Sequence, residues 1–146
     1  KSPEPAADYL IPFGKASIVL AGSDLTVVTW GTGVIRCLRA AQELAKDGIS
    51  VEVIDVRTLV PLDEGTIVES VRRTGKAIVV HEAPLPGGFG GEIAARISER
   101  CFEQLDAPVR RLCAKDCFVA YAGSLEAAIL PSQDDVSAAI RDLARF

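Results

Sequence analysis

The sequence lacks the features that mark several classes of protein. No run of apolar residues approaches the roughly 20 that are needed to cross a bilayer, and the N-terminus, Lys1-Ser2-Pro3-Glu4-Pro5, lacks an apolar signal core. No block of lysine and arginine stands out, and the formal net charge is -4, which disfavours nucleic acid as a partner. We therefore expect a soluble, intracellular protein with neither a membrane nor a nucleic-acid partner.

The cysteines do not follow a metal-binding pattern either. The four cysteines, at positions 37, 101, 113 and 117, include no Cys-x-x-Cys pair, and His81 is the only histidine that could complete a zinc site. Unpaired, reduced and mostly buried cysteines are the simpler interpretation. We therefore predict no metal site.

What the sequence does contain is typical of one globular domain. It has 146 residues, of which 49% are hydrophobic and 25% charged, and this length is enough for a single core. Residues 1–8 carry two prolines, two alanines and charged side chains, a composition that we interpret as a linker. Residues 9–146 are expected to form the domain.

Strands and helices are predicted to alternate along the domain. Short runs rich in β-branched and apolar residues predict strands over 16–20, 25–30, 51–56, 77–80 and 109–112. Helical spacing of apolar residues, including Val34, Ile35, Leu38 and Ala41, predicts a helix between Gly33 and Gly48. Further helices are expected over 64–73, from the glycine-rich loop 84–91 to about 104, over 124–130, and from Asp134 or Asp135 onward. This alternation predicts an α/β fold, with three α/β/α layers around a mostly parallel sheet.

The turn after the second strand admits a cofactor-binding alternative. Gly31 and Gly33 lie between a strand and a helix, and Asp55 follows about 20 residues later, where a ribose-binding acid stands in dinucleotide-binding folds. The third glycine of that pattern is replaced by Arg36. A tight strand-to-helix turn is the simpler interpretation, and a nucleotide-binding or regulatory module is kept as an alternative.

The end of the fourth strand is the other candidate site. His81 and Glu82 stand where functional groups gather in open α/β sheets, and acid–base chemistry is one possibility for them. We find no obvious serine, cysteine or second histidine to pair with His81, so a structural or interfacial role is favoured. The glycine-rich loop that follows, with Gly87, Gly88 and Phe89, is expected to let the backbone pack closely against a neighbouring subunit.

Several segments in order resemble the beta subunit of the decarboxylating component of 2-oxo acid dehydrogenase complexes. They are Ile11–Ala16, Ser50–Asp63, His81-Glu82-Ala83-Pro84 with the glycine-rich loop, Leu105-Asp106-Ala107-Pro108 and Leu130-Pro131-Ser132. The resemblance covers about residues 9–146. The His81–Pro84 segment, the Trp30-Gly31-Thr32 turn and Cys101-Phe102 look closest to the branched-chain type, with pyruvate and acetoin enzymes as alternatives. The His81-Glu82-Ala83-Pro84 and Leu105-Asp106-Ala107-Pro108 segments argue against a transketolase or a deoxyxylulose phosphate synthase.

The resemblance implies a fold, and it implies which part of the complete enzyme binds the cofactors. The fold is that of the transketolase C-terminal domain, a five-stranded mixed sheet whose first strand is antiparallel. The complete enzyme uses thiamine diphosphate and magnesium, which this domain is not expected to bind alone. The linker would lead from a missing N-terminal pyrimidine-binding domain. The whole enzyme would lie in the cytoplasm of a bacterium or in the mitochondrial matrix of a eukaryote.

The resemblance also implies partners. They are an alpha subunit and a second beta subunit in an α2β2 tetramer, and the subunit-binding domain of the dihydrolipoyl acyltransferase. The residues expected at these interfaces are His81, Glu82, Gly87, Gly88, Phe89, Asp116 and Phe146, of which Asp116 and the Phe146 carboxylate are expected to meet the acyltransferase. In one segment, Asp116–Tyr121, the sequence departs from the family's pattern and lacks its two prolines, which frees the backbone there.

Overall fold

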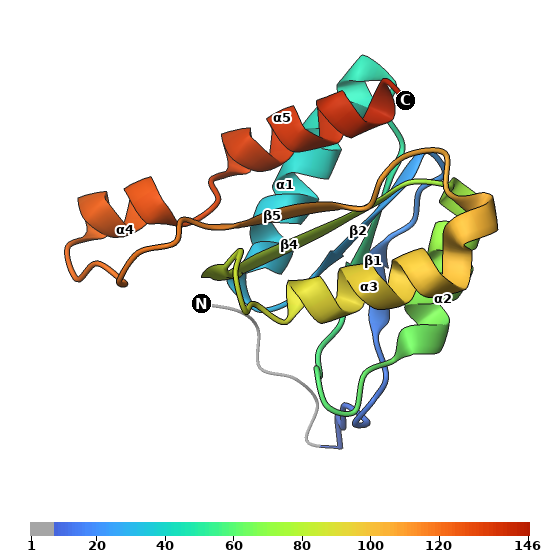
Figure 1. Cartoon of the computed structure of the whole chain (residues 1–146), viewed down its shortest axis with the longest axis horizontal. Helices are drawn as coiled ribbons and strands as arrows, with labels where there is room; N and C mark the ends of the chain where they lie inside the picture. Colours follow the sequence, from blue (N-terminus) through green and yellow to red (C-terminus); the bar gives the residue numbers. More distant parts are fainter. Residues whose placement is uncertain (1–7) are drawn as a thin grey trace.

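A computed structural model describes residues 8–146, so that all of the predicted linker except Asp8 lies outside the described residues (Figure 1). The strands are β1 (Ser17–Leu20), β2 (Leu25–Thr29), β3 (Val51–Asp55), β4 (Ala77–Pro84) and β5 (Arg110–Ala114). They form one sheet in the order β1-β3-β2-β4-β5. β1 is antiparallel to β3 and all other neighbours are parallel. The predicted five-stranded sheet with an antiparallel first strand is confirmed.

Helices cover both faces of the sheet (Figure 1). One face carries α1 (Thr32–Leu44), which continues as the 3-10 turn η1 (Ala45–Asp47), and α5 (Gln133–Ala144). The other face carries α2 (Glu64–Thr74) and α3 (Gly90–Cys101), followed by the 3-10 turn η2 (Phe102–Gln104). The short helix α4 (Gly123–Ile129) covers neither face and projects from the body. No helix within residues 8–146 has the length and apolarity needed to cross a membrane.

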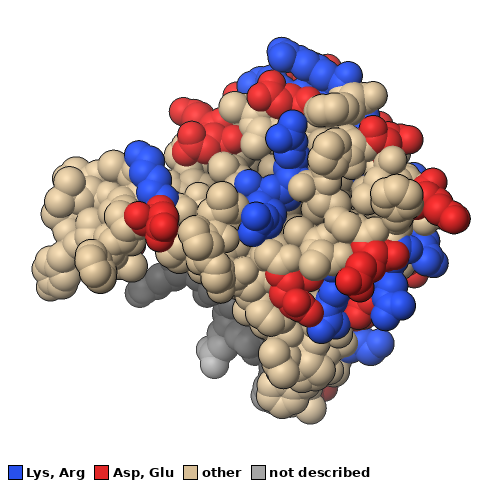
Figure 2. Space-filling model, viewed as in Figure 1, with Lys and Arg blue, Asp and Glu red and all other residues tan. Residues whose placement is uncertain are grey.

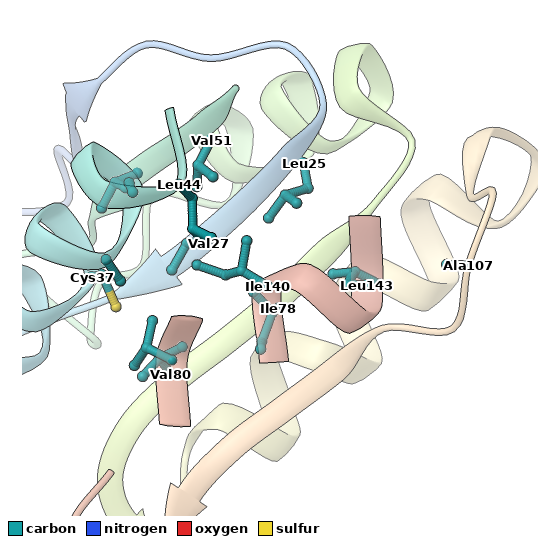
Figure 3. Packing of buried hydrophobic residues seen from close by; sticks show 14 residues of the cluster. Leu25, Val27, Cys37, Leu44, Val51, Ile78, Val80, Ala107, Ile140 and Leu143 are labelled. Atoms are coloured by element: carbon teal, nitrogen blue, oxygen red, sulfur yellow. The ribbon is translucent and has the colours of Figure 1, made fainter. Parts of the chain in front are cut away.

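The sheet separates two apolar cores. Toward α1 and α5, side chains of β2 and β4 pack against both helices (Figure 3), with Leu25, Val27, Leu44, Ile140 and Leu143 all 0% exposed. Toward α2 and α3, the core includes Val28, Ile67, Val71, Val79, Ile93 and Ile97. Each fully buried aliphatic side chain contributes roughly 1.5–3 kcal/mol. β2 is buried at every position, as a strand covered on both faces must be.

Two elements differ from their predicted form. Ile35, one of the apolar positions used to predict α1, is 55% exposed, while Cys37 and Ala40 are buried instead. Small side chains there let α5 pack against α1. β4 runs four residues beyond its predicted end, through His81 to Pro84. The apolar run stops at Val80, but His81 stays buried because its ring nitrogens find partners inside the protein.

Local hydrogen bonds fix the helix starts. Asp63, predicted as an N-cap, accepts from the backbone N–H of Thr66 at the start of α2, and its carboxylate also accepts from the N–H of Ala16 at 3.0 Å. Burial alone would raise the pKa of Asp63, but the hydrogen bonds from Ala16 and Thr66 outweigh it and lower the pKa. α5 is capped by Ser132 and Asp135 in a capping box, so it begins slightly before the predicted Asp134 or Asp135.

One charged residue lies inside the sheet. Glu52 of β3 is 2% exposed, and its carboxylate accepts hydrogen bonds from the Ser70 hydroxyl and from Arg73. Ser70 is linked in turn to Thr26 of β2. Because a buried carboxylate is tolerated only when it is paired and hydrogen-bonded, this network binds α2 to the middle of the sheet.

Candidate functional site

The carboxyl ends of the parallel strands meet at one edge of the sheet, where the candidate residues were expected. Trp30 follows β2, Asp55 ends β3, His81 and Glu82 lie in the last half of β4, and Cys113 lies near the end of β5. The glycine-rich loop between β4 and α3 covers this edge. The structure therefore brings His81, Glu82, Gly87, Gly88 and Phe89 into one region.

The His81 ring is enclosed in the protein. It is 1% exposed and stacks on Trp30, with ring centroids 5.2 Å apart and an interplanar angle of 12°. A Cβ atom added at Gly88 would lie 2.6 Å from Cε1 of the ring, and one added at Gly90 would collide with Nε2 and Cδ2. The glycines thus allow a close approach to His81 of the same chain, and the approach of this loop to a neighbouring subunit stays a prediction.

Both ring nitrogens have partners. Nδ1 accepts a hydrogen bond from the backbone N–H of Ala83 at 3.2 Å, a role that requires this nitrogen to be unprotonated. The neutral ring therefore carries its proton on Nε2, which lies 3.2 Å from Sγ of Cys113. The prediction that no cysteine pairs with His81 is wrong: Cys113 on the neighbouring strand does so.

The electrostatics of this pair disfavour nucleophilic chemistry. Burial, together with the positive charge of Arg111, lowers the pKa of His81. Burial raises the pKa of the Cys113 thiol, against the opposing effect of Arg111. A neutral imidazole beside a protonated thiol is not the thiolate–imidazolium pair that cysteine nucleophiles use. The arrangement supports the structural role for His81, and its buried ring can act on another chain only through the loop that it holds.

Glu82, unlike His81, points to solvent. Its carboxylate forms an ion pair with Arg36 of α1, with 2.9 Å between Nη1 and Oε1. Arg36 is the residue that replaces the third glycine of a dinucleotide-binding turn, and Asp55 accepts instead from the backbone N–H of Arg57 at 3.0 Å. Gly31, with a φ of 60°, makes the tight turn that the simpler interpretation requires. No observation here favours the nucleotide-binding alternative, which stays a prediction.

A shallow hollow of about 520 Å³ lies beside the glycine-rich loop. Residues 59–62 of the loop before α2, residues 87–89 of the glycine-rich loop, and Glu92 and Arg96 of α3 line it. Val60, within this lining, is 82% exposed, and Leu85 in the glycine-rich loop is 45% exposed. Exposed apolar side chains grouped in this way are typical of a protein-binding surface.

The structure does not bring together the two residues expected to contact the acyltransferase. Asp116 follows the carboxyl end of β5, whereas Phe146 lies beside Arg110 at the opposite end, with the Arg110 guanidinium 5.9 Å from the ring centroid. A strand advances about 3.3 Å per residue, so the two residues lie at opposite ends of the strand. A partner that contacts both within one chain must span the whole strand.

The remaining cysteines are dispersed. Cys37 and Cys101 are buried and Cys117 is exposed. Burial raises the pKa of Cys37 to about 12. Across residues 8–146, no three acidic, histidine or cysteine side chains come together in a way that could hold a metal ion.

Comparison with known proteins gives consistent matches over most of the chain. Residues 14–136 match the family described as transketolase, C-terminal domain. The chain is 44% identical to the 2-oxoisovalerate dehydrogenase subunit beta of Bacillus subtilis (strain 168), an alignment that covers 100% of this chain and 45% of that protein. It is also 44% identical to the mitochondrial pyruvate dehydrogenase E1 component subunit beta of Dictyostelium discoideum, over 92% of this chain and 38% of that protein.

Solved structures agree with the fold. The structure of a split gene transketolase, an inactive beta4 tetramer, superimposes with a TM-score of 0.78 at 28% identity, and covers 98% of this chain and 46% of that one. The chain thus spans less than half the length of the proteins it matches.

Proposed function

The chain belongs to the transketolase C-terminal domain family, and from that premise we propose that it is the assembly and partner-binding domain of the beta subunit of a thiamine diphosphate-dependent 2-oxo acid dehydrogenase. The complete enzyme oxidatively decarboxylates a branched-chain 2-oxo acid and transfers the acyl group to a lipoyl group. The observation that carries this proposal is the 44% identity to a 2-oxoisovalerate dehydrogenase beta subunit along the whole chain.

The local chemistry supports assembly rather than catalysis. The paired histidine and cysteine at the sheet edge are a neutral ring and a protonated thiol, and both serve to seat the glycine-rich loop. Around them, Val60, Leu85 and the hollow at Phe89 present apolar surface. We assign these loops to contacts with the alpha subunit and with a second beta subunit of an α2β2 tetramer.

The cofactor belongs elsewhere in this proposal. Thiamine diphosphate, when bound in the complete enzyme, supplies the electron sink for decarboxylation. Following the resemblance to beta subunits of 2-oxo acid dehydrogenases, we place thiamine diphosphate and magnesium outside this domain. The contribution of this chain is to hold the subunits that enclose them. We also propose that the complete enzyme lies in the cytoplasm of a bacterium or in the mitochondrial matrix of a eukaryote.

The acyltransferase contact is the most specific part of the proposal. Asp116, an acidic residue, and Phe146 are both exposed, and we propose that they meet a basic subunit-binding domain. Charged groups at such an interface would mainly fix how the two proteins align and how fast they associate. Because the two groups lie at opposite ends of β5, the acyltransferase domain must either span the strand or contact residues of two beta subunits.

Reconstitution tests the substrate and the division of labour. The domain is joined to the remainder of a beta subunit and combined with an alpha subunit, and carbon dioxide release is measured with 2-oxoisovalerate and with pyruvate. We expect turnover by the assembled enzyme, with a higher kcat/KM for 2-oxoisovalerate, and none by residues 1–146 alone. Turnover by residues 1–146 alone would refute the assembly role, and a preference for pyruvate would favour the pyruvate dehydrogenase alternative.

A further inference from the structure

The glycine-rich loop between β4 and α3 is held to the body of the domain by contacts with two side chains. The backbone of Gly88 and of Gly90 lies directly against the His81 ring, so closely that a Cβ atom at either position would meet it. On the neighbouring strand β5, Nη1 of Arg111 donates a hydrogen bond to the Leu85 carbonyl at 3.2 Å. The side chains of the loop itself are half-buried or exposed. The position of the loop therefore depends on His81 and Arg111.

The His81 ring has a place for one proton only. The hydrogen bond from the Ala83 N–H requires a lone pair on Nδ1, and Nε2 already carries the proton that faces Sγ of Cys113. A second proton, on Nδ1, would set two donors against each other across the 3.2 Å that separate the two nitrogens. The ring can therefore accept this proton only if it moves away from Ala83.

The side chains of β5 that face the ring offer no negative charge. Burial and the positive charge of Arg111 lower the pKa of His81, and burial keeps the Cys113 thiol protonated by raising its pKa. Arg110 and Arg111 are both exposed, and Figure 2 shows basic side chains near the middle of the face that β5 crosses. The face of Trp30 attracts a cation, but such an attraction is weaker than the cost of burying an unpaired charge.

The acidic residues that flank the ring along the chain have partners of their own. Glu82, the next residue of β4, points to solvent and pairs with Arg36 of α1 at 2.9 Å. Glu92, in the first turn of α3, pairs with Arg96 at 2.8 Å. A protonated His81 would therefore be a buried cation without a counter-charge, a state that costs free energy until the group reaches water.

We propose that His81 is a pH-sensitive switch for the glycine-rich loop: when the ring gains a second proton, it turns out of its site, and the loop moves away from β4 with it. The ring cannot leave while Gly88 and Gly90 lie against it, so the two movements are coupled. Repulsion between the new cation and Arg111 also loosens the second contact of the loop, at Leu85. The hollow beside the loop then loses residues 87–89 from its lining. The conformational change belongs to this chain alone, whereas a resulting loss of subunit contacts rests on the assembly role proposed above.

The direction of the switch follows from the environment of the ring. Because burial and Arg111 lower the pKa of His81, the ring stays neutral at pH 7 and gains its second proton only below the ordinary histidine pKa of about 6.5. The loop therefore lies against the ring at neutral pH and moves away from it on acidification.

A pH titration followed by NMR and fluorescence tests whether the ring and the loop change together. His81 is the only histidine and Trp30 the only tryptophan of the chain, so the Cε1–H signal of the ring and the indole fluorescence each report on one known site. We expect both signals, and the amide signals of Gly88 and Gly90, to change with one midpoint below about pH 6.5. The protection factor of the Gly91 N–H, which donates to the Gly88 carbonyl at 2.9 Å, should fall at least about tenfold across this midpoint. Far-UV circular dichroism at each pH checks that the chain stays folded.

Two results of the titration would overturn the proposal. One is a ring that gains its proton while the loop amides and the Trp30 fluorescence do not follow. The other is a chain that unfolds before the ring gains its proton, because the folded domain would then contain no switch.

A pair of variants on β5 tests the role of charge. Arg111→Gln removes the positive charge near the ring and keeps a side chain that can donate to the Leu85 carbonyl, so the midpoint should move to higher pH. Arg110→Gln is the matched control and should leave the midpoint unchanged, since Arg110 is also exposed on β5 but lies over the Phe146 ring. No shift with Arg111→Gln, a shift to lower pH, or an equal shift in both variants would overturn the proposal. All of these measurements use the 146-residue chain by itself, so their failure leaves the substrate and turnover experiment unaffected.

Discussion

The neutral His81 ring fills a space that few other side chains could occupy. One face stacks on Trp30 and the ring edge lies against the backbone of Gly88 and Gly90. Protonation of Nδ1 would remove the hydrogen bond from Ala83, and it would place a cation near Arg111. The position of the glycine-rich loop therefore depends on the protonation state of one residue.

This dependence gives a pH prediction. The pKa of His81 is lowered by folding, so below the ordinary histidine pKa of about 6.5 the unfolded chain binds a proton that the folded chain resists. The contribution of His81 to stability is thus full above pH 6.5 and is lost as the pH falls toward the folded-state pKa. Urea unfolding at several pH values between 7.5 and 5 measures it.

The control for the pH prediction is a variant that lacks the histidine. His81 is its only histidine, so His81→Gln should flatten the decline in unfolding free energy over this range, whatever its effect on absolute stability. The same decline in both proteins would show that other groups cause it.

Asp63 acts at the scale of elements, because one carboxylate joins α2 to the segment that leads into β1. Loss of a helix N-cap costs about 1 kcal/mol, and an N–H left without its partner at Ala16 costs about 1 kcal/mol more. Asp63→Ala should therefore lower the free energy of unfolding by about 2 kcal/mol. Ser132→Ala, which removes the cap of α5 alone, should cost about 1 kcal/mol. Urea denaturation compares them, and equal losses would mean that the Ala16 contact contributes nothing.

The elements also show what the sequence can predict. Apolar runs predict β2 and β3 within one residue, because both strands are buried on two faces. They do not predict that β4 continues through His81, or that the side chain of Glu52 in β3 is buried, since each polar group is stabilised by residues distant in the sequence. In α1 the large Ile35 is exposed while the small Cys37 and Ala40 are buried, an arrangement set by the neighbouring α5.

The candidate site also has one part that the sequence predicts and one part that it does not. The edge that gathers His81, Glu82 and the glycine-rich loop is predictable, because parallel strands end together. The pairing of His81 with Cys113 depends on the register of β5 against β4, which no local pattern encodes. A useful signal was nevertheless present, since Cys113 stands near the end of a predicted neighbouring strand.

At the scale of the whole molecule, residues 115–130, which contain α4 and are called the arm here, project from the folded body (Figure 1). Replacing residues 118–125 with a Gly/Ser segment of equal length should change the unfolding free energy by no more than about 0.5 kcal/mol, because none of these residues contributes to either core. Thermal or urea unfolding of dilute, monomeric protein measures this. Ile140→Ala, a change in the core, should cost about 2–5 kcal/mol under the same conditions. A comparable loss from the arm replacement would show that the arm supports the body.

The strand order has a consequence for how the chain reaches this structure. No strand of the sheet pairs with its neighbour in sequence through a hairpin: Leu25 pairs with Val51, Thr26 with Ala77, and Ile78 with Arg110. Every ladder must therefore close a long loop before it gains its first hydrogen bond, and topologies with such distant contacts fold slowly. During synthesis, β1 must wait for β3 to leave the ribosome, so β1 and β2 remain unpaired until the middle of the domain has been made.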